Sequence, residues 1–412
     1  MGLSNNILNF NCNNKKIIYL IFFLPIALIA GSSIINITIF LIIFLFLIEL
    51  YKKKRFDFIL NKDFYLLLII YLYIVINSIF ISQNSNGIIS AIGILRFIIL
   101  AFALAYYMKL ENNKYEKKIF NFWALVLIIV TIDIFFEYIF GHNLLNFKSN
   151  YPGRLASFTG SELKIGGYYF GFFLLSLSFF YSYKKKYFYP LFISLLIASL
   201  LIGERSNFIK VFFISNLFFF ITYKTPILKK IILLVIGTIV VSIVLFKHEP
   251  TKTRFYDDIF LRINNFGFLN YLKTNKHGLH YITSIEVFKQ HKFFGIGFKN
   301  FRNESHKKEY NINNERNVWA PHPHQIHFEF LSELGLVGYL MLILLLIYYI
   351  TNGFIIYNKN KNLYLLSASL FTLATIMPAI PSGSFFTSFT ASIFWINFSI
   401  ILKNKIKKNY IN

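Results

Sequence analysis

The sequence contains very little cysteine and few charged residues. Cys12 is the only cysteine among 412 residues, and 15% of the residues are charged. A single thiol excludes a disulfide within the chain and a metal site built from several thiolates. The charged fraction is well below that of soluble domains, and the hydrophobic fraction of 56% is above it. We find neither an internal repeat nor a long low-complexity tract.

A nucleotide-binding loop is missing as well. The "GIG" segment at 295–297 lacks both the strand-to-helix context and the Lys-Ser/Thr pair of a P-loop. The net charge of +24 would suit a nucleic-acid partner, but the basic residues are distributed unevenly. With a cytoplasmic N-terminus, most lie in inner segments, and the short outer loops hold Lys148, Arg154, Lys164 and Arg205. This is the positive-inside rule, so the basic residues indicate contact with anionic membrane lipids and no nucleic-acid partner.

Long apolar runs are what the sequence has in abundance. Roughly 17 to 25 mostly apolar residues suffice to cross a ~30 Å hydrocarbon core as a helix. We therefore predict an all-α, polytopic integral membrane protein with about twelve transmembrane helices. A second run follows the first at once, so the first is interpreted as a retained helix and not as a cleaved signal peptide. The predicted spans are 17–31, 34–50, 64–81, 88–108, 118–140, 165–182, 187–202, 206–222, 229–247, 324–350, 363–380 and 385–402.

These runs predict one integrated membrane domain with both termini in the cytoplasm. Spans one to nine occupy residues 1–247, and the last three spans occupy residues 324–412. Between them lies a large outer loop at 248–323 that carries Lys and Arg freely, as long translocated loops do. A shorter outer loop covers residues 141–164.

Titratable residues gather on the outer side of the predicted bundle. Ionisable groups within spans are costly in lipid and usually face a bundle interior or a wet cavity. Their outward bias predicts a polar cavity open to the outer leaflet, although snorkelling to the interface stays an alternative, above all for Lys210. The ionisable residues within spans are Arg96, Asp133, Glu137, Lys210, Glu329 and Glu333. The histidines, all outside or at the outer boundary, are His142, His248, His277, His280, His291, His306, His322, His324 and His327.

The stretch "PHPHQIHFEFLSELGLVGY" at 321–339 places three histidines directly before an apolar run. Pro321 and Pro323 disfavour an earlier helix start, so we expect the helix to begin at about His324. Glycines on the same face would allow a neighbouring helix to approach closely. At 100° per residue, the residues that would share this face are His324, His327, Leu331, Gly335 and Gly338.

Three interpretations of these histidines compete. A metal site is one, but His322 and His324 straddle a proline and no carboxylate shares their predicted helix face. Interfacial histidines that contact water and headgroups are the second. The third is a general base, because histidine titrates near neutrality and can accept a proton from a substrate hydroxyl.

The spacing His324-Gln325, nine residues, Gly335, two residues, Gly338 resembles the signature of the O-antigen ligase and O-antigen polymerase superfamily. In that signature, a His followed by Asn, Ser or Gln precedes nine residues and G-x-x-G. Other stretches are similar to the family in the same order, on a matching twelve-span topology from about residue 130 to 400. These stretches are "DIFFEYIFGHNL" (133–144), "GRLASFTGSELKIGGYY" (153–169), "GERSNF" (203–208), "FFGIGFKNFR" (293–302) and "PAIPSGSFF" (378–386).

The resemblance implies a GT-C-like membrane glycosyltransferase in the bacterial inner membrane. Such enzymes move a glycan from undecaprenyl diphosphate to an acceptor at the periplasmic face, without nucleotide sugar, ATP, cofactor or metal. The acceptor is the lipid A–core in ligases, and another growing glycan or exopolysaccharide in polymerases. We favour a ligase, because 133–169 and 203–208 look more ligase-like, and keep a polymerase as the alternative. A lipid or glycan transporter is a distant third, since it predicts broken spans near the midplane and only Pro25 lies near the middle of a span.

The resemblance also implies roles for single residues. His324 would deprotonate the acceptor hydroxyl, and Arg205 and Arg154 would bind the diphosphate, because arginine is always charged and binds phosphate bidentately. Arg205 could instead pair with Glu204, and Arg154 could be an ordinary loop charge. An arginine that the family often has before its Gly-rich turn has no direct counterpart here. Its substitutes would be His280 or His277, or Arg262 or Arg254, and the further candidates for substrate contact are His322 and Arg96.

Overall fold

The computed structural model describes residues 2–160, 162–223, 226–310 and 320–406, and this part of the chain is helical, without strands. The all-α prediction is therefore confirmed there. The helices are α1 (Gly2–Ala30), α2 (Ser32–Lys53), α3 (Lys62–Asn77), α4 (Ser85–Gly93), α5 (Leu95–Phe140), α6 (Ile165–Tyr183), α7 (Phe188–Leu201), α8 (Arg205–Thr222), α9 (Ile227–Lys247), α10 (Glu249–Lys252), α11 (Arg262–Phe266), α12 (Phe268–Thr274), α13 (Lys276–Gln290), α14 (Phe301–Glu304), α15 (Ile326–Asn360), α16 (Leu363–Thr375) and α17 (Ser388–Lys405). The short 3-10 or π-helical segments are η1 (Phe56–Phe58), η2 (Ser78–Ser82), η3 (Ser157–Thr159), η4 (Lys185–Tyr187), η5 (Thr253–Leu261) and η6 (Lys308–Tyr310).

A helix lies over each of the predicted apolar runs. Within the described ranges, seven helical segments are long and apolar enough to cross a bilayer, and α16 and residues 16–30 of α1 are shorter apolar helices. The chain is thus a membrane protein, while the number of twelve spans stays a prediction. The seven segments are Ser32–Lys53, Lys62–Ser82, Ser85–Leu110, Asn113–Phe140, Ile165–Tyr183, Ile227–Lys247 and Ile326–Asn360.

Helix α5 takes in most of two predicted runs, 88–108 and 118–140. Asn113 within it has a φ of 68°, whereas a residue in an α-helix has a φ near −63°. The helix axis therefore cannot run straight through this residue, and the segments on either side of it correspond to separate predicted spans.

Small residues let α16 and α17 pack closely on α6. The hydroxyls of Ser178 in α6 and Ser367 in α16 are 2.6 Å apart. In α17, Nδ2 of Asn397 donates to the carbonyl oxygen of Gly171, at 3.1 Å. A Cβ at Gly171 would lie 2.4 Å from Cγ2 of Ile393, so a larger residue would push the two helices apart. Such small and hydrogen-bonding residues draw membrane helices together.

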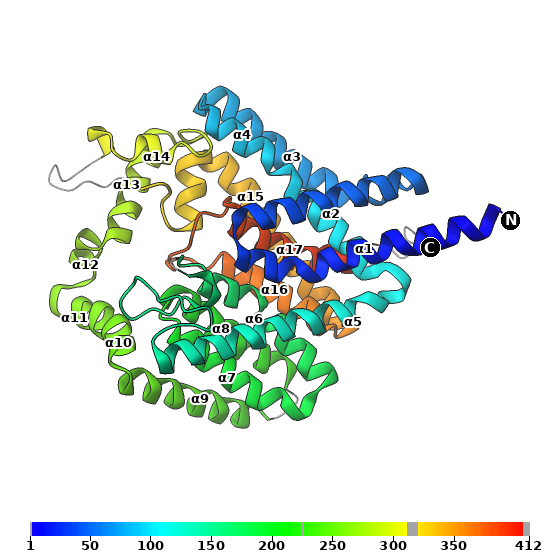
Figure 1. The fold of residues 1–412 in the computed structure, drawn as a ribbon. Coiled ribbons are helices and arrows are strands. Elements are labelled where there is room, and N and C mark those ends of the chain that lie inside the picture. Colours follow the sequence, from blue (N-terminus) through cyan, green and yellow to red (C-terminus); the bar gives the residue numbers. More distant parts are fainter. Residues whose placement is uncertain (1, 161, 224–225, 311–319, 407–412) are drawn as a thin grey trace.

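Basic residues gather at one end of the bundle. Lys403 of α17 pairs with Glu116 of α5 at 2.5 Å, and Lys405 pairs with Asp63 of α3 at 2.5 Å. Segments that the sequence assigns to one side of the membrane therefore meet, although the orientation of that side stays a prediction. Figure 1 shows α9 along the flank of the bundle, with α10 to α13 curving around the end at the left of the view.

Helix α15 is interrupted where the sequence predicted a continuous face. Gly335 has φ 67° and ψ −172°, which is outside the helical region. The Gly-rich turn at 292–297 packs against this break, and a Cβ at Gly335 would lie 2.3 Å from the carbonyl oxygen of Phe293. The amide of Ile296 donates to the carbonyl of Ser332 at 3.0 Å, so the turn satisfies backbone groups that the break releases. The predicted helix face through Gly338 is therefore wrong beyond the break.

Candidate functional site

Several of the arginines and histidines singled out from the sequence, among them Arg205, Arg154 and His324, line a cavity of about 610 Å³. It is lined by the 153–167 segment, the start of α8, η5, α13, the residues before α15, the end of α16 and the 381–394 segment. Among the described residues that line it, Glu204 is the one carboxylate, so the cavity is strongly cationic and suits an anion. The cationic and histidine residues of its wall are Arg154, Lys164, Arg205, Lys210, Arg254, His277, His322 and His324.

Two glycines bring three arginines to one place. Gly203, between α7 and α8, has a φ of 74°, and a Cβ there would lie 2.2 Å from the carbonyl oxygen of Gly153. A Cβ on Gly153 would in turn lie 3.0 Å from Cδ of Arg254. Since Arg154 and Arg205 directly follow this contact in the chain, the "GR" and "GER" segments present their guanidinium groups to the same cavity. We call Arg154, Arg205 and Arg254 the arginine cluster.

The arginine cluster is held by backbone oxygens and has little neutralising charge of its own. A guanidinium nitrogen of Arg205 donates to the carbonyl of Arg254 at 2.6 Å, and Nε of Arg254 donates to the carbonyl of Gly203 at 3.0 Å. Arg205 forms an ion pair with Asp258, at 3.8 Å. The alternative that Arg205 pairs with Glu204 is therefore not found among the ion pairs of the described residues. Burial, with the charges of Arg154 and Arg205, lowers the pKa of Arg254 to about 10. A bound anion would relieve this repulsion.

Arg154 lies on a loop that two buried carboxylates anchor. Glu137 of α5 accepts hydrogen bonds from the amides of Ala156 at 3.1 Å and Ser157 at 2.6 Å. Asp133, one turn earlier, accepts from the hydroxyl of Ser157 at 2.6 Å. Neither carboxylate lines the cavity. The prediction that these acidic groups face the polar cavity is therefore wrong, because they satisfy the backbone and hydroxyl of the 141–164 loop instead.

His324 precedes α15, which begins at Ile326, whereas the sequence had predicted that the helix begins at about His324. Gln325 caps the helix, accepting at Oε1 from the amide of His327 at 2.7 Å. His324 itself has a φ of 61°, a left-handed conformation that non-glycine residues rarely adopt. The amide of Ser382 donates to its carbonyl oxygen at 2.7 Å, which ties this conformation to the 381–385 turn. The turn and the cap thus direct His324 into the cavity.

Three other histidine rings lie around the ring of His324. The ring centroid of His324 is 4.0 Å from that of His322, 5.1 Å from that of His277 and 5.4 Å from that of His280. Burial, followed by the charges of the neighbouring histidines, lowers the pKa of His324 to about 3. Burial and Lys299 similarly lower the pKa of His322 to about 4. His324 is therefore neutral at pH 7 and holds a free lone pair for a proton.

The metal interpretation gains nothing from this geometry. Within the described ranges, no three His, Cys, Asp or Glu side chains are arranged to hold a metal ion. His327 points elsewhere, with Nε2 2.9 Å from the carbonyl oxygen of Ile376 and Nδ1 3.2 Å from the hydroxyl of Tyr339.

Three predicted contact residues do not line the cavity. His280 stacks on His324 from behind, at an interplanar angle of 27°. Arg262 is exposed and pairs with Asp258 at 3.6 Å. Arg96 of α5 donates to the hydroxyl of Ser388, at 3.1 Å, and Ser388 is a wall residue. Their substrate-binding roles therefore stay predictions, and none of the three side chains lines the cavity in this structure.

Glu329 and Glu333 also lie outside the cavity wall. Glu329 accepts from the hydroxyl of Ser384 and, at 2.9 Å, from the amide of Phe385. Glu333 accepts from the amide of Lys299 at 3.0 Å. Like Asp133 and Glu137, they hold backbone segments that shape the cavity.

Two wall residues received no definite role from the sequence. Arg254 was one of several residues that could replace the missing family arginine. It reaches the cavity through the contact of Gly153 with Gly203, and no local sequence pattern indicates this contact. Lys210 was identified from the sequence as a charged residue within a predicted span. That position is itself the signal for a functional residue, because charged residues within membrane spans usually face a bundle interior or a wet cavity.

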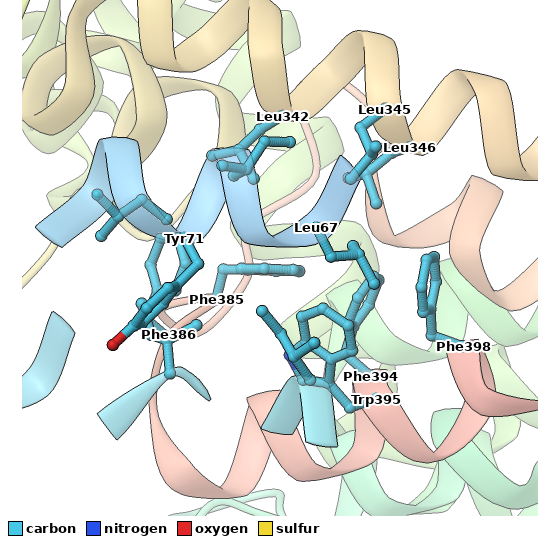
Figure 2. A pocket seen from close by; sticks show the side chains of 14 residues that line it. Leu67, Tyr71, Leu342, Leu345, Leu346, Phe385, Phe386, Phe394, Trp395 and Phe398 are labelled. Carbon is cyan, nitrogen blue, oxygen red and sulfur yellow. The ribbon is translucent and has the colours of Figure 1, made fainter. Parts of the chain in front are cut away.

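A second, apolar cavity of about 40 Å³ adjoins the first. Figure 2 shows its wall, with side chains from α3, α15 and α17 and the Phe385–Phe386 pair. Phe385 and Phe394 line both cavities. Its volume has room for a water-sized group and is far too small for a lipid chain, so this is packing space between helices.

Comparison with known proteins finds one family that matches part of the chain. Residues 190–343 match the family model described as O-Antigen ligase. The matched segment begins in α7 and ends in α15, so it contains Arg205, Arg254 and the histidines of the wall. No curated protein matches the chain significantly.

Proposed function

We propose the reaction of this protein from the match of residues 190–343 to the O-antigen ligase family, whose members are membrane enzymes of the glycosyltransferase or ligase type. The protein transfers a glycan from undecaprenyl diphosphate to a lipid A–core acceptor at the periplasmic face of the bacterial inner membrane. The observation that carries the proposal is that a neutral, strained histidine and three arginines line the same cavity.

The arginine cluster supplies the charge that a diphosphate donor needs. Cleavage of the glycosyl–phosphate bond leaves an electron pair on the phosphate oxygen, and stabilising this charge is often the largest catalytic term. Arg205 and Arg254 are fixed by hydrogen bonds to backbone oxygens before the donor binds, so little reorganisation of these two side chains is required. The cluster thereby binds the donor and stabilises the leaving group.

His324 serves as the general base. The acceptor hydroxyl transfers its proton to the neutral imidazole while its oxygen attacks the anomeric carbon and the bond to the diphosphate breaks, in one inverting displacement. A low histidine pKa weakens the base, but a bound diphosphate would raise it, because nearby negative charge favours the imidazolium. Binding of the donor would thus make His324 a stronger base for the acceptor hydroxyl.

The ring contacts around His324 support this role further. His322 and His277 both line the cavity and confine the ring of His324 from two sides. Burial and the charges of Arg205 and Arg154 lower the pKa of His277, so it too is neutral and adds no competing positive charge. His322 and His277 are therefore positioning residues beside the base.

A gene deletion tests the proposal. Loss of the polymerised ladder on a lipopolysaccharide gel, with intact core and accumulation of polymer on undecaprenyl diphosphate, is the expected result. Core bearing a single repeat unit would identify a polymerase instead, and loss of all periplasmic glycan without lipid-linked intermediates there would identify a transporter.

Complementation with variants ties the phenotype to the site. His324→Ala should fail to restore the ladder. His142→Ala is the matched control, because His142 lies in the outer loop, contacts the carbonyl of Asn143 and is absent from the cavity wall. Full complementation by His324→Ala would refute the general-base assignment.

A further inference from the structure

Lys210 is a buried ammonium group that lacks an ionic partner. It lies on α8 with a side chain 4% exposed, and it lines the cavity. Among the described residues, no carboxylate pairs with it and no hydrogen-bond acceptor is recorded for it; its contact is with the ring of Phe170, 5.5 Å from Nζ to the centroid. Burying an unpaired charge costs several kcal/mol, so this residue requires a reason.

Two structural explanations fall short. Snorkelling does not explain the residue, because Lys210 is buried within the bundle and lines the cavity. A cation–π contact is a weak interaction and does not offset the burial of an unpaired ammonium group. An anion bound in the cavity would supply the ionic partner that Lys210 lacks.

The surroundings of Lys210 differ from those of the arginine cluster. Lys210 is five positions after Arg205, so it lies about 7.5 Å further along α8, towards the interior of the bundle. The wall near its ring partner is apolar, with Phe170 packed against Phe371 at a centroid distance of 4.5 Å. The cavity thus has a polar mouth with three arginines and an apolar inner end with one lysine.

We propose that Lys210 binds the lipid-linked phosphate of the donor, while the arginine cluster binds the phosphate attached to the sugar. The inference rests on the proposed function, since it assumes a lipid diphosphate donor. In such an amphiphile, one phosphate adjoins the glycan and the other adjoins the apolar chain. The order of the cavity residues, histidine and arginines first and then lysine among aromatic rings, matches the order of the groups in the ligand.

This assignment makes Lys210 a specificity residue. It requires a phosphate ester at the apolar end, which a lipid monophosphate and a lipid diphosphate both have and a free sugar phosphate lacks. The arginine cluster adds the discrimination for the second phosphate. Breaking of the glycosyl bond leaves the lipid-side phosphate unchanged, so Lys210 contributes to donor binding more than to the chemical step.

Binding measurements on the full chain in lipid nanodiscs test the inference. The probes are undecaprenyl monophosphate and undecaprenyl diphosphate, and the variants are Lys210→Met, Lys210→Arg and Arg205→Gln. Lys210→Met should weaken both lipids about tenfold or more, because it removes a charge-assisted contact. Lys210→Arg, which keeps the charge, should restore most of the affinity. Arg205→Gln should weaken the diphosphate much more than the monophosphate.

A stability measurement excludes a merely structural lysine. Removing an unpaired buried charge should raise the thermal stability of the unliganded Lys210→Met protein, so that affinity and stability change in opposite directions. If Lys210→Met leaves both affinities unchanged while Arg205→Gln weakens the diphosphate, the inference is wrong and the proposed function stands. If neither variant changes the affinity for the diphosphate, the proposed donor is wrong as well. If Lys210→Met lowers the stability, the lysine is structural.

Discussion

The contact between Gly203 and Gly153 should be decisive for the site. In Gly203→Ala, a methyl group must enter a left-handed backbone position with a φ of 74°, 2.2 Å from the carbonyl oxygen of Gly153. The left-handed conformation alone costs a non-glycine residue roughly 1 to 3 kcal/mol. The overlap is with backbone and not with a flexible side chain, so the two segments must separate. We expect a total loss of about 3 to 5 kcal/mol in the free energy of unfolding, at the upper end of single substitutions.

A second glycine allows the cost of the left-handed conformation and the cost of the steric contact to be measured separately. Gly141 also has a φ of 77°, but nothing lies within 4 Å of a Cβ placed there. Gly141→Ala should therefore show the conformational cost alone, and the difference between the variants measures the contact. Separation of the segments would also displace Arg154 from Arg205, so Gly203→Ala should lose transfer activity and Gly141→Ala should keep it. Thermal unfolding in nanodiscs and a transfer assay report both quantities, and equal results for the two variants would refute the account of how the arginines are brought together.

Other predictions follow from the same geometry. Arg205→Lys keeps the charge but loses bidentate phosphate binding, so the transfer rate should fall by about 10²-fold; an unchanged rate would contradict the assignment. Glu137→Ala leaves two buried amides without an acceptor and should destabilise the protein by roughly 2 to 4 kcal/mol, with faster proteolysis of the 141–157 loop as the readout. The pKa of His324 is lowered to about 3, so the free enzyme keeps its base neutral and kcat/KM should stay level from pH 8 to pH 5. A midpoint near the ordinary histidine pKa would show that burial does not lower the pKa of the base in the free enzyme.

Much of the fold follows from hydrophobic runs alone. A helix covers each predicted run because the chain must satisfy its backbone hydrogen bonds internally within lipid. The resemblance to O-antigen ligases is confirmed for residues 190–343. The joint roles of His324, Arg154 and Arg205 were implied by the family resemblance, and they remain predictions.

What the sequence did not predict depends on contacts between distant segments. The left-handed conformation of His324 depends on Ser382, which lies far along the chain. The break at Gly335 depends on the turn at 292–297, which supplies the missing backbone partners. Asp133 was assigned to the cavity because an acidic group in a span usually faces water, but the loop hydroxyl of Ser157 provided the partner instead. Periodicity within one segment carries no information on these pairings.

Reconstituted transfer tests the central claim most directly. Purified protein in nanodiscs would receive undecaprenyl-diphosphate-linked glycan and lipid A–core, and both glycosylated core and released undecaprenyl diphosphate would be quantified. The account predicts one released undecaprenyl diphosphate per glycan transferred, and a loss of about 10²-fold or more in His324→Ala with donor binding retained. Transfer at the wild-type rate by His324→Ala, or a product formed without release of undecaprenyl diphosphate, would contradict it.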